Sequence, residues 1–316
     1  MPASPVELVE VGPRDGLQNE ARTLPVGTRV ELITRLLALG VRRLEAVSFV
    51  RPDRVPQMAG AEEVMAQVPR RDDVTYIGLV LNRRGAERAA LTACTEVNVV
   101  VPVTDAFAER NQGASTAALV EQAAGAVGVA REAGMSVTVT LAVAFGCPFT
   151  GAVPLERVRE VTDRVLDLGL DELAFADTVG VGTPDQVAAL AGLVRGDARV
   201  PALRWHFHNT RNTGYANAWA AATQRRDAGQ RLALDASLGG FGGCPFAPAA
   251  TGNIATEDLA YLLRHGGVAA SGPERLDLAA ADASARWLAE QVGTPVTAQL
   301  GRAGDAPDPV ERAVRA

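Results

Sequence analysis

Residues 137–176 read "VTVTLAVAFGCPFTGAVPLERVREVTDRVLDLGLDELAFA" and contain one complete strand–helix–strand unit. Residues 137–143 are rich in β-branched and apolar side chains, and 172–176 form a second short apolar run, so both are predicted strands. Residues 154–169 repeat apolar side chains at helical spacing and end in Gly169, as helices that stop at a glycine do. Two strands joined by a helix run parallel.

The same alternation of strand and helix continues along the whole chain. Further helical patterns cover 26–40, 115–134 and 183–196, and the eight predicted strands are 6–11, 42–47, 74–80, 96–101, 137–143, 172–176, 203–208 and 231–237. Eight units at this spacing predict an α/β fold, a closed (β/α)8 TIM barrel with extra C-terminal helices. A doubly wound open sheet is the alternative, but no GxGxxG follows the first strand. We expect residues 1–270 to form the catalytic barrel and 271–316 a C-terminal helical extension and tail.

Composition excludes several classes of protein. The 316 residues carry a net charge of −6, which argues against binding nucleic acid or a membrane surface. No apolar run reaches the length of a membrane span. The three cysteines, Cys94, Cys147 and Cys244, are too few and scattered for a disulfide framework, so a cytoplasmic location is expected.

The chain contains no lysine, and all 31 basic residues are arginine. Schiff-base aldolase chemistry, an internal pyridoxal phosphate linkage, biotin attachment and the P-loop lysine are therefore excluded. If the protein makes or breaks carbon–carbon bonds, a metal ion must accept the electrons.

Two of the three histidines, His206 and His208, lie at the end of a predicted strand. Residues i and i+2 of a strand point to the same face, about 6–7 Å apart at Cα. The pair therefore predicts either a metal site or two half-buried histidines with backbone partners. In a barrel, the loops at the carboxyl ends of the strands carry the chemistry, and this pair belongs to such a loop, which favours the metal.

A carboxylate for the same ion follows the first strand in "VGPRDG". Asp15 is the expected ligand, and Arg14 is expected to face developing negative charge; the alternative is a solvated surface ion pair. Asn253 either adds an amide oxygen or caps a helix. Such a donor set suits Mg²⁺ or Mn²⁺, with Zn²⁺ and Fe²⁺ as alternatives.

Other strand ends supply further candidates. Glu45 would need a partner if it points inward, and Arg14 is the expected one. Gln18 and Asp177 are expected to bind substrate together with Arg14, although Asp177 suits a helix-capping role equally well.

A loop rich in glycine and alanine, "GGFGGCPFAPAATGN" (239–253), follows the eighth strand and carries Cys244. A thiol on a mobile lid can donate or accept a proton over a bound substrate. The alternative is an inert, buried cysteine. "GCPF" also occurs at 146–149, but Cys147 closes a short turn, so Cys244 is the preferred catalytic copy.

Taken together, "EVGPRDGLQNE", "SFVRPDRVPQMAG", "GCPF", "DTVGVGTP", "HFHN" and "GGCPFAPAATGNIATEDL" resemble the 3-hydroxy-3-methylglutaryl-CoA lyase family over residues 6 to about 270. The resemblance implies retro-Claisen cleavage of an acyl-CoA, with acetyl-CoA as one product, and a homodimer. It implies Mg²⁺ or Mn²⁺ bound by Asp15, His206, His208 and Asn253. It also implies that Arg14 stabilises the enolate, that Glu45 supports Arg14 and that Cys244 transfers a proton. The general base is left open between a histidine, Asp15 and water.

The chain departs from that family at four positions. Asn209 replaces the usual Asp after the histidines, Thr140 and Ala142 replace Tyr and Ser, and Ala174 replaces Ser. The lost hydroxyl groups predict an altered acyl preference with the metal chemistry intact. A condensing or aldol enzyme acting on a 2-oxo acid, and a catalytically silent binding barrel, are the two alternative functions.

Overall fold

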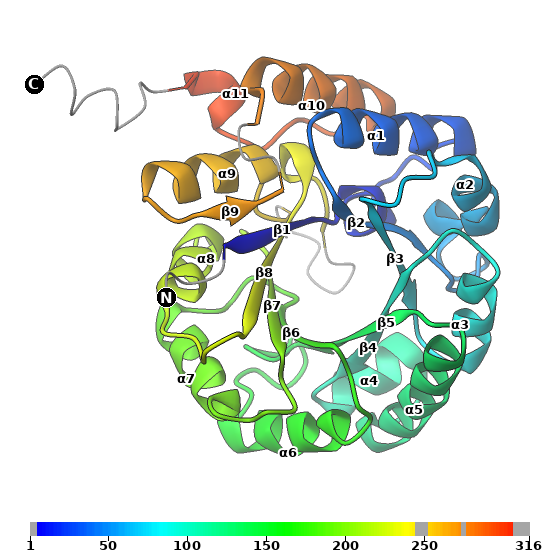
Figure 1. The fold of residues 1–316 in the computed structure, drawn as a ribbon, viewed down its shortest axis with the longest axis vertical. Coiled ribbons are helices and arrows are strands. Elements are labelled where there is room, and N and C mark those ends of the chain that lie inside the picture. Colours follow the sequence, from blue (N-terminus) through cyan, green and yellow to red (C-terminus); the bar gives the residue numbers. More distant parts are fainter. Residues whose placement is uncertain (1–4, 244–251, 273–275, 306–316) are drawn as a thin grey trace, which may run out of the picture.

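The computed structural model describes residues 5–243, 252–272 and 276–305, and its centre is a closed barrel of eight parallel strands (Figure 1). Each strand pairs with the next, and β8 pairs with β1, which also pairs with β2. The strands are β1 (Val6–Glu10), β2 (Arg43–Ser48), β3 (Thr75–Val80), β4 (Glu96–Pro102), β5 (Ser136–Ala142), β6 (Glu172–Asp177), β7 (Ala202–Phe207) and β8 (Arg231–Ala236).

Helices surround the barrel as an outer ring. They are α1 (Val26–Ala38), α2 (Ala61–Gln67), α3 (Arg83–Ala90), α4 (Asp105–Gln112), α5 (Thr116–Glu132), α6 (Leu155–Leu166), α7 (Pro184–Val194), α8 (Gly214–Thr223) and α9 (Thr256–His265). Their apolar faces and the outward side chains of the strands form one extended hydrophobic core.

The predicted TIM barrel is confirmed, and the doubly wound alternative is wrong, because β8 closes the sheet onto β1. All eight predicted strands are present, with ends that differ by one residue at most. The unit 137–176 is observed as β5, α6 and β6, in which β5 and β6 pair in parallel from Thr138 with Glu172 to Leu141 with Phe175.

The interior of the barrel is charged near the amino-terminal ends of the strands. Arg43 on β2 donates to Glu96 on β4 (Nη2 to Oε1, 2.6 Å), to Glu172 on β6 (Nη2 to Oε1, 2.7 Å) and to Glu7 on β1 (Nη1 to Oε2, 2.8 Å). Thr138 on β5 donates to Glu96 as well (2.7 Å). Because each buried charge has a partner, the cluster satisfies its own polar groups and closes this end of the barrel.

The C-terminal segment packs on the barrel through β9 (Ala270–Ser271), α10 (Leu278–Val292) and α11 (Leu300–Ala303). The short strand β9 pairs in parallel with β1, and α10 packs against α1 and the turn Leu238–Gly240 (Figure 1). The expected boundary after residue 270 therefore falls inside β9, which the sequence pattern did not predict.

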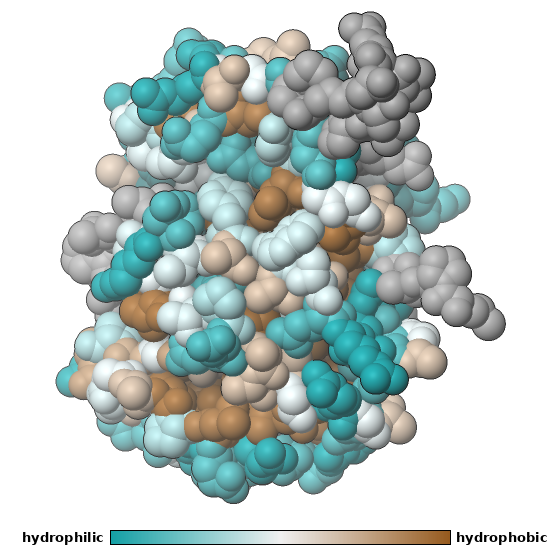
Figure 2. Space-filling view, turned by 90° about the vertical axis from the view of Figure 1, so that its left-hand side faces the viewer, coloured by the Kyte–Doolittle hydropathy of each residue, from teal (hydrophilic) through white to brown (hydrophobic). Residues whose placement is uncertain are grey.

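The outer surface shown in Figure 2 mixes hydrophilic residues with smaller hydrophobic areas. Within the described ranges, no helix is both long and apolar enough to cross a membrane.

Candidate metal centre and active-site cavity

His206 and His208 meet Asp15 at the carboxyl-terminal mouth of the barrel. His206 lies in β7 and His208 directly after it, while Asp15 lies in the buried helical turn Gly12–Gly16 that follows β1. The Nε2 atoms of the two histidines are 3.0 Å apart, and Asp15 Oδ2 is 3.8 Å from Nε2 of His206 and 3.5 Å from that of His208. One ligand atom from each of the three residues lies within 4.8 Å of the other two.

The geometry of the three ligand atoms fits a divalent cation. Two ligands about 2.1 Å from an octahedral ion lie about 3.0 Å apart, which is the separation of the two imidazole nitrogens. Asp235 on β8 contacts Nδ1 of His206 through Oδ2 (3.0 Å). When Nδ1 donates to that carboxylate, the lone pair of Nε2 is free to face the ion, as in most metal-binding histidines.

The ionisation of Asp15 and His206 reflects their mutual contacts. Burial opposes the charged form of Asp15, but the Arg14 guanidinium and both imidazoles hold the pKa of this carboxyl well below its usual value. Burial lowers the pKa of His206, but Asp235 and Asp15 outweigh it and raise that pKa overall. The carboxylate of Asp15 is therefore kept ionised, as a ligand of a cation must be.

Asn253 completes the same group of side chains. Its Nδ2 is 2.9 Å from Asp15 Oδ2 and 3.0 Å from the carbonyl oxygen of Phe241, and its Oδ1 is buried with no hydrogen-bond partner among the described residues. The amide group is therefore oriented with its nitrogen towards two acceptors, and its unpartnered oxygen is the atom that a cation could satisfy. The helix-capping alternative is wrong, because α9 is capped by Ala255 rather than Asn253.

Arg14 is held by two carboxylates beside this group. Its Nε donates to Glu45 Oε2 (2.6 Å), its Nη2 also pairs with Glu45, and its Nη1 donates to Asp15 Oδ1 (2.6 Å). Glu45 is fully buried and accepts from Asn98, which in turn accepts from Thr140, both at 2.7 Å. The predicted Glu45–Arg14 contact is thus present, and the surface ion-pair alternative for Arg14 and Asp15 is wrong because both are 8 % exposed.

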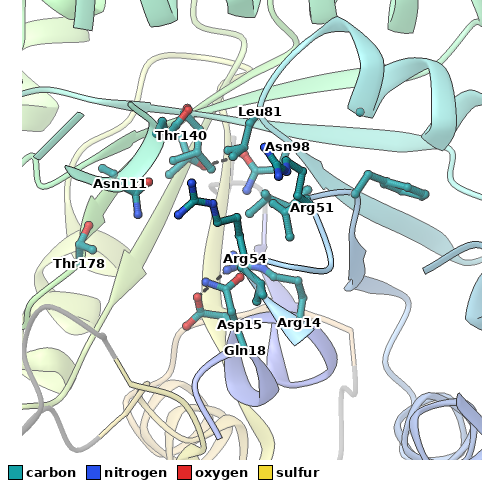
Figure 3. Close-up of a pocket in the computed structure, with 18 of the residues that line it drawn as sticks. Arg14, Asp15, Gln18, Arg51, Arg54, Leu81, Asn98, Asn111, Thr140 and Thr178 are labelled. Atoms are coloured by element: carbon teal, nitrogen blue, oxygen red, sulfur yellow. Dashed lines mark hydrogen bonds and ion pairs between the residues drawn. The ribbon is translucent and has the colours of Figure 1, made fainter. Parts of the chain in front are cut away.

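A cavity of about 1480 Å³ opens above these residues (Figure 3). Its floor contains Arg14, Asp15, His206, His208 and Asp235, and Gln18 contributes to its wall as predicted. Its remaining walls come from strands β4 to β6, from helices α3 and α4 and from the loops beside them, and include Arg51, Arg54, Leu81, Arg83, Arg84, Arg88, Asn98, Arg110, Asn111, Thr140, Ala142, Ala176 and Thr178. The cavity therefore combines a group of side chains that could hold a cation with an apolar wall that includes Leu81, Ala142 and Ala176. Its arginine-rich perimeter consists of Arg51, Arg54, Arg83, Arg84, Arg88 and Arg110.

Asp177 does not line this cavity. Its side chain is fully buried, and its two oxygens accept the backbone N–H groups of Val181 and Gly182 at 2.9 Å each. Burial raises the pKa of this carboxyl despite the two hydrogen bonds. The predicted helix-capping role is wrong, because Thr183 is the N-cap of α7, and Asp177 instead holds the backbone of the loop after β6.

The proposed acid Cys244 lies outside the described residues. The residue before it, Gly243, lines the cavity, and its carbonyl oxygen accepts from Asn19 Nδ2 (2.6 Å). Cys147 is 4 % exposed and accepts a hydrogen bond from Thr104 Oγ1 at 3.2 Å, away from the cavity lining.

Two of the four departures from the family pattern face the cavity. Thr140 and Ala142 line it, whereas Ala174 lies deeper in the barrel and is 1 % exposed. Asn209 accepts the backbone N–H of Gly214 at the start of α8 (3.1 Å), so it supports the loop that follows the histidines. Of these four positions, only Thr140 and Ala142 therefore alter the lining of the cavity.

Sequence reasoning missed Asp235 and Asn98. Both are polar residues inside otherwise apolar strands, "RLALDAS" and "EVNVVV". That placement is the signal that could have identified them, because an inward polar side chain in a barrel needs a partner.

This fold and these residues define a TIM-barrel enzyme with an Asp/His/His group that could hold a metal ion and an arginine at the mouth. The HMGL-like family model matches residues 5–282, and the chain belongs to this family. It is 44 % identical over 310 residues to the (R)-citramalyl-CoA lyase of Chloroflexus aurantiacus, covering 95 % of each chain. It is 43 % identical over 298 residues to the hydroxymethylglutaryl-CoA lyase of Pseudomonas mevalonii, covering 94 % of this chain and 93 % of that one.

Solved structures of HMG-CoA lyases support the same family assignment. An HMG-CoA lyase from Acinetobacter baumannii in complex with coenzyme A and 3-methylmalate superimposes with a TM-score of 0.86 at 34 % identity, covering 96 % of each chain. The chain is accordingly a carbon–carbon lyase of the HMG-CoA lyase family, acting on an acyl-CoA, with an Asp/His/His group suited to a divalent metal.

Proposed function

We propose that the protein is a divalent-metal-dependent retro-Claisen lyase with an altered acyl preference. It cleaves a thioester similar to 3-hydroxy-3-methylglutaryl-CoA to acetyl-CoA and a 3-oxo acid. The observation that carries this proposal is the convergence of Asp15, His206 and His208 beside Arg14 at the floor of one cavity. The expected metal is Mg²⁺ or Mn²⁺.

The chemistry requires that the 3-hydroxyl lose its proton, that the C2–C3 bond break, and that its electron pair pass to the thioester as an enolate. A divalent cation held by Asp15, His206, His208 and Asn253 would supply Lewis acidity towards the substrate oxygens. The hydroxyl proton passes to a base among His206, Asp15 and water. The enolate then takes a proton at C2 from Cys244, which yields acetyl-CoA, while the former hydroxyl carbon becomes a ketone.

Arg14 is suited to stabilise the enolate. Three of its N–H groups are engaged by Glu45 and Asp15, which fix the guanidinium and leave two N–H groups for substrate. Burial lowers the pKa of Arg14, but Glu45 and Asp15 outweigh it, so the pKa is raised and the charge is kept. A preorganised donor of this kind contributes about 3–4 kcal/mol to a transition state that develops an oxyanion.

Coenzyme A is the acyl carrier in this proposal. Phosphate groups need cationic or helix N-terminal partners, and in a chain without lysine the cations must be arginines. The perimeter of the cavity supplies several, including Arg83, Arg84 and Arg110. The coenzyme A bound to the Acinetobacter relative supports the same carrier.

Citramalyl-CoA is a second candidate substrate. It is favoured by the 44 % identity to the Chloroflexus lyase over 95 % of both chains. Its cleavage also gives acetyl-CoA, with a 2-oxo acid as the other product. The smaller side chain of Thr140 and the missing hydroxyl at Ala142 support a difference in acyl preference from 3-hydroxy-3-methylglutaryl-CoA, and they fit either substrate class.

The test is the release of acetyl-CoA from a panel of 3-hydroxyacyl-CoA thioesters with Mg²⁺ or Mn²⁺, assayed in both directions. We expect metal-dependent cleavage that is lost in Asp15→Asn and retained in Asp53→Asn, since Asp53 lines the cavity away from the metal group. Net condensation with a 2-oxo acid and no cleavage would favour a synthase instead. Cleavage of 3-hydroxy-3-methylglutaryl-CoA as the best substrate would contradict the altered preference.

The homodimer, the cytoplasmic location and the division at residue 270 stay predictions. Sedimentation of the purified protein would test the first, and expression of residues 1–270 alone would test the last. Because β9 and α10 pack on β1, α1 and the turn Leu238–Gly240, we expect that truncated chain to be unstable.

A further inference from the structure

Most arginines that line the cavity are already engaged by the protein. Arg14 is held by Glu45 and Asp15, and three arginines on the perimeter pair with neighbouring carboxylates. Arg110 donates to a backbone carbonyl and lies over the Phe149 ring, 4.2 Å from its centroid. The perimeter pairs are Arg51 with Asp53, Arg83 with Glu87, and Arg88 with Glu62.

Arg54 differs from these arginines. Within the described part of the chain, its guanidinium has no hydrogen bond and no ion pair, although it lines the cavity. The carboxylate of the adjacent Asp53 makes its hydrogen bonds to Arg51, at 3.0 and 2.6 Å, and interacts with Arg54 only through charge. Figure 3 draws Arg54 in the middle of the cavity, between Asn111 and Thr140 on one side and Asp15 and Gln18 on the other.

The backbone that carries Arg54 is held in place. The N–H groups of Arg54 and Val55 both donate to the carbonyl oxygen of Arg51, at 3.0 and 3.1 Å, which forms a tight turn. Gln57 then donates to the carbonyl oxygen of Glu20 (2.9 Å), so this loop is tied to the loop after β1 that also carries Asp15. The Arg54 side chain is exposed, so its guanidinium, carried on a fixed stretch of backbone, is accessible to a ligand in the cavity.

We propose that Arg54 binds the carboxylate of the acyl group and so selects thioesters that carry a second negative charge. This inference rests on the proposed function, since it names the part of the substrate that Arg54 recognises. The oxo-acid half of such a thioester must lie between the metal group and the wall formed by Thr140 and Ala142. A guanidinium fork facing that space matches a carboxylate with two parallel hydrogen bonds.

The arrangement of charges in the cavity supports this assignment. The guanidinium of Arg14 is already engaged by Glu45 and Asp15. The guanidinium of Arg54 is therefore the cation on this side of the cavity that can pair with a carboxylate of the acyl group.

Arg84 provides a matched control. It also lines the cavity and also has no hydrogen bond or ion pair in the part of the chain that the structure describes, but it lies in the first turn of α3, beside Arg83. We assign Arg84 to the carrier rather than to the acyl group. Replacing either arginine with glutamine removes one unpaired charge from the same cavity.

The first experiment compares kcat/KM for three thioesters of coenzyme A. Two carry a carboxylate on the acyl group, 3-hydroxy-3-methylglutaryl-CoA and citramalyl-CoA, and the third, 3-hydroxy-3-methylbutyryl-CoA, does not. The wild type should cleave one of the two carboxylate-bearing thioesters better than the other, and that one is compared with the neutral thioester. Arg54→Gln should reduce the ratio of their kcat/KM values by about 10- to 100-fold, which is the value of a charge-assisted hydrogen bond. Arg84→Gln should keep the ratio, and Arg54→Lys should restore it in part, because it keeps the charge but not the fork.

A second measurement does not depend on turnover. Glutaryl-CoA keeps a terminal carboxylate but has no 3-hydroxyl to cleave, and valeryl-CoA is its uncharged counterpart. By calorimetry, Arg54→Gln should weaken glutaryl-CoA binding about 10-fold or more and leave valeryl-CoA binding unchanged.

Two outcomes would overturn the assignment. Equal losses for charged and uncharged thioesters would show that Arg54 contacts the carrier, and unchanged binding of all of them would show that it contacts neither. If the wild-type protein cleaves no thioester but Arg54→Gln still loses glutaryl-CoA selectively, the proposed function fails while this inference stands.

Discussion

Glu257 should make the stability of the fold depend on pH. It lies in the first turn of α9, is 3 % exposed, and both of its oxygens accept the backbone N–H of Gly239 in the turn after β8, at 3.1 and 3.0 Å. Burial raises the pKa of this carboxyl from 4.5 to about 8. We therefore expect Glu257→Gln to remove a pH-dependent part of the free energy of unfolding.

The direction follows from the two pKa values. In the folded chain Glu257 stays protonated up to about pH 8, whereas in the unfolded chain it ionises above about pH 4.5. The protonated form therefore favours folding fully below pH 4.5, and this contribution is lost as the pH rises to 8. At about 1.4 kcal/mol per pKa unit, the loss between pH 5 and 8.5 is about 4 kcal/mol.

The assay is urea unfolding of the wild type and Glu257→Gln at several pH values. Their difference in unfolding free energy should shift by about 4 kcal/mol in favour of the variant as the pH rises, because the amide cannot ionise. Glu63→Gln, at an exposed site on α2, is the matched control and should show no such trend. A difference that stays flat from pH 5 to 8.5 would refute the reasoning, since Glu257 would then ionise alike in both states.

Three further predictions concern the cavity. Mn²⁺ at about a hundred times its dissociation constant should raise the free energy of unfolding by about 2.7 kcal/mol, measured by thermal unfolding. Asp15→Asn should abolish this stabilisation, and Asp53→Asn should keep it. Equal stabilisation of the wild type and both variants would contradict the metal site. Glu45→Gln should lower kcat about 100-fold with a smaller change in KM, because Arg14 loses its buried carboxylate; an unchanged kcat would exclude the positioning role. Ala142→Leu should reduce kcat/KM about 10-fold more for thioesters with a bulky substituent at C3 than for small ones, and a uniform loss would place the acyl group elsewhere.

The barrel could be predicted because its strands and helices differ in hydrophobic period, which is a local property of the sequence. The pairing of His206 with His208 was predictable for the same reason, since only their spacing on one strand was needed. Their approach to Asp15 followed once the barrel was inferred, because all strand ends meet at one mouth.

What could not be predicted depends on which side chains face one another across the barrel. Asp235 and Asn98 carry no special sequence pattern, and their roles appear only when β8 lies next to β7 and β4 next to β5. Asp177 has a sequence context that suits a substrate ligand and a helix cap equally, and its actual contacts with the loop backbone depend on the orientation of residues 181 and 182. Strand β9 is two residues long, too short for any periodicity to reveal.

The Arg43 cluster has a consequence for how this enzyme's selectivity can evolve. Its carboxylates and guanidinium fill the barrel near the amino-terminal ends of the strands. Extending the cavity towards that end would remove one partner and leave a buried charge unpaired, at a cost of about 3–5 kcal/mol. New acyl groups must therefore be accommodated by changing the size of side chains in the cavity walls near the carboxyl ends of the strands. Libraries aimed at the loops should yield active variants far more often than libraries aimed at the strand interiors.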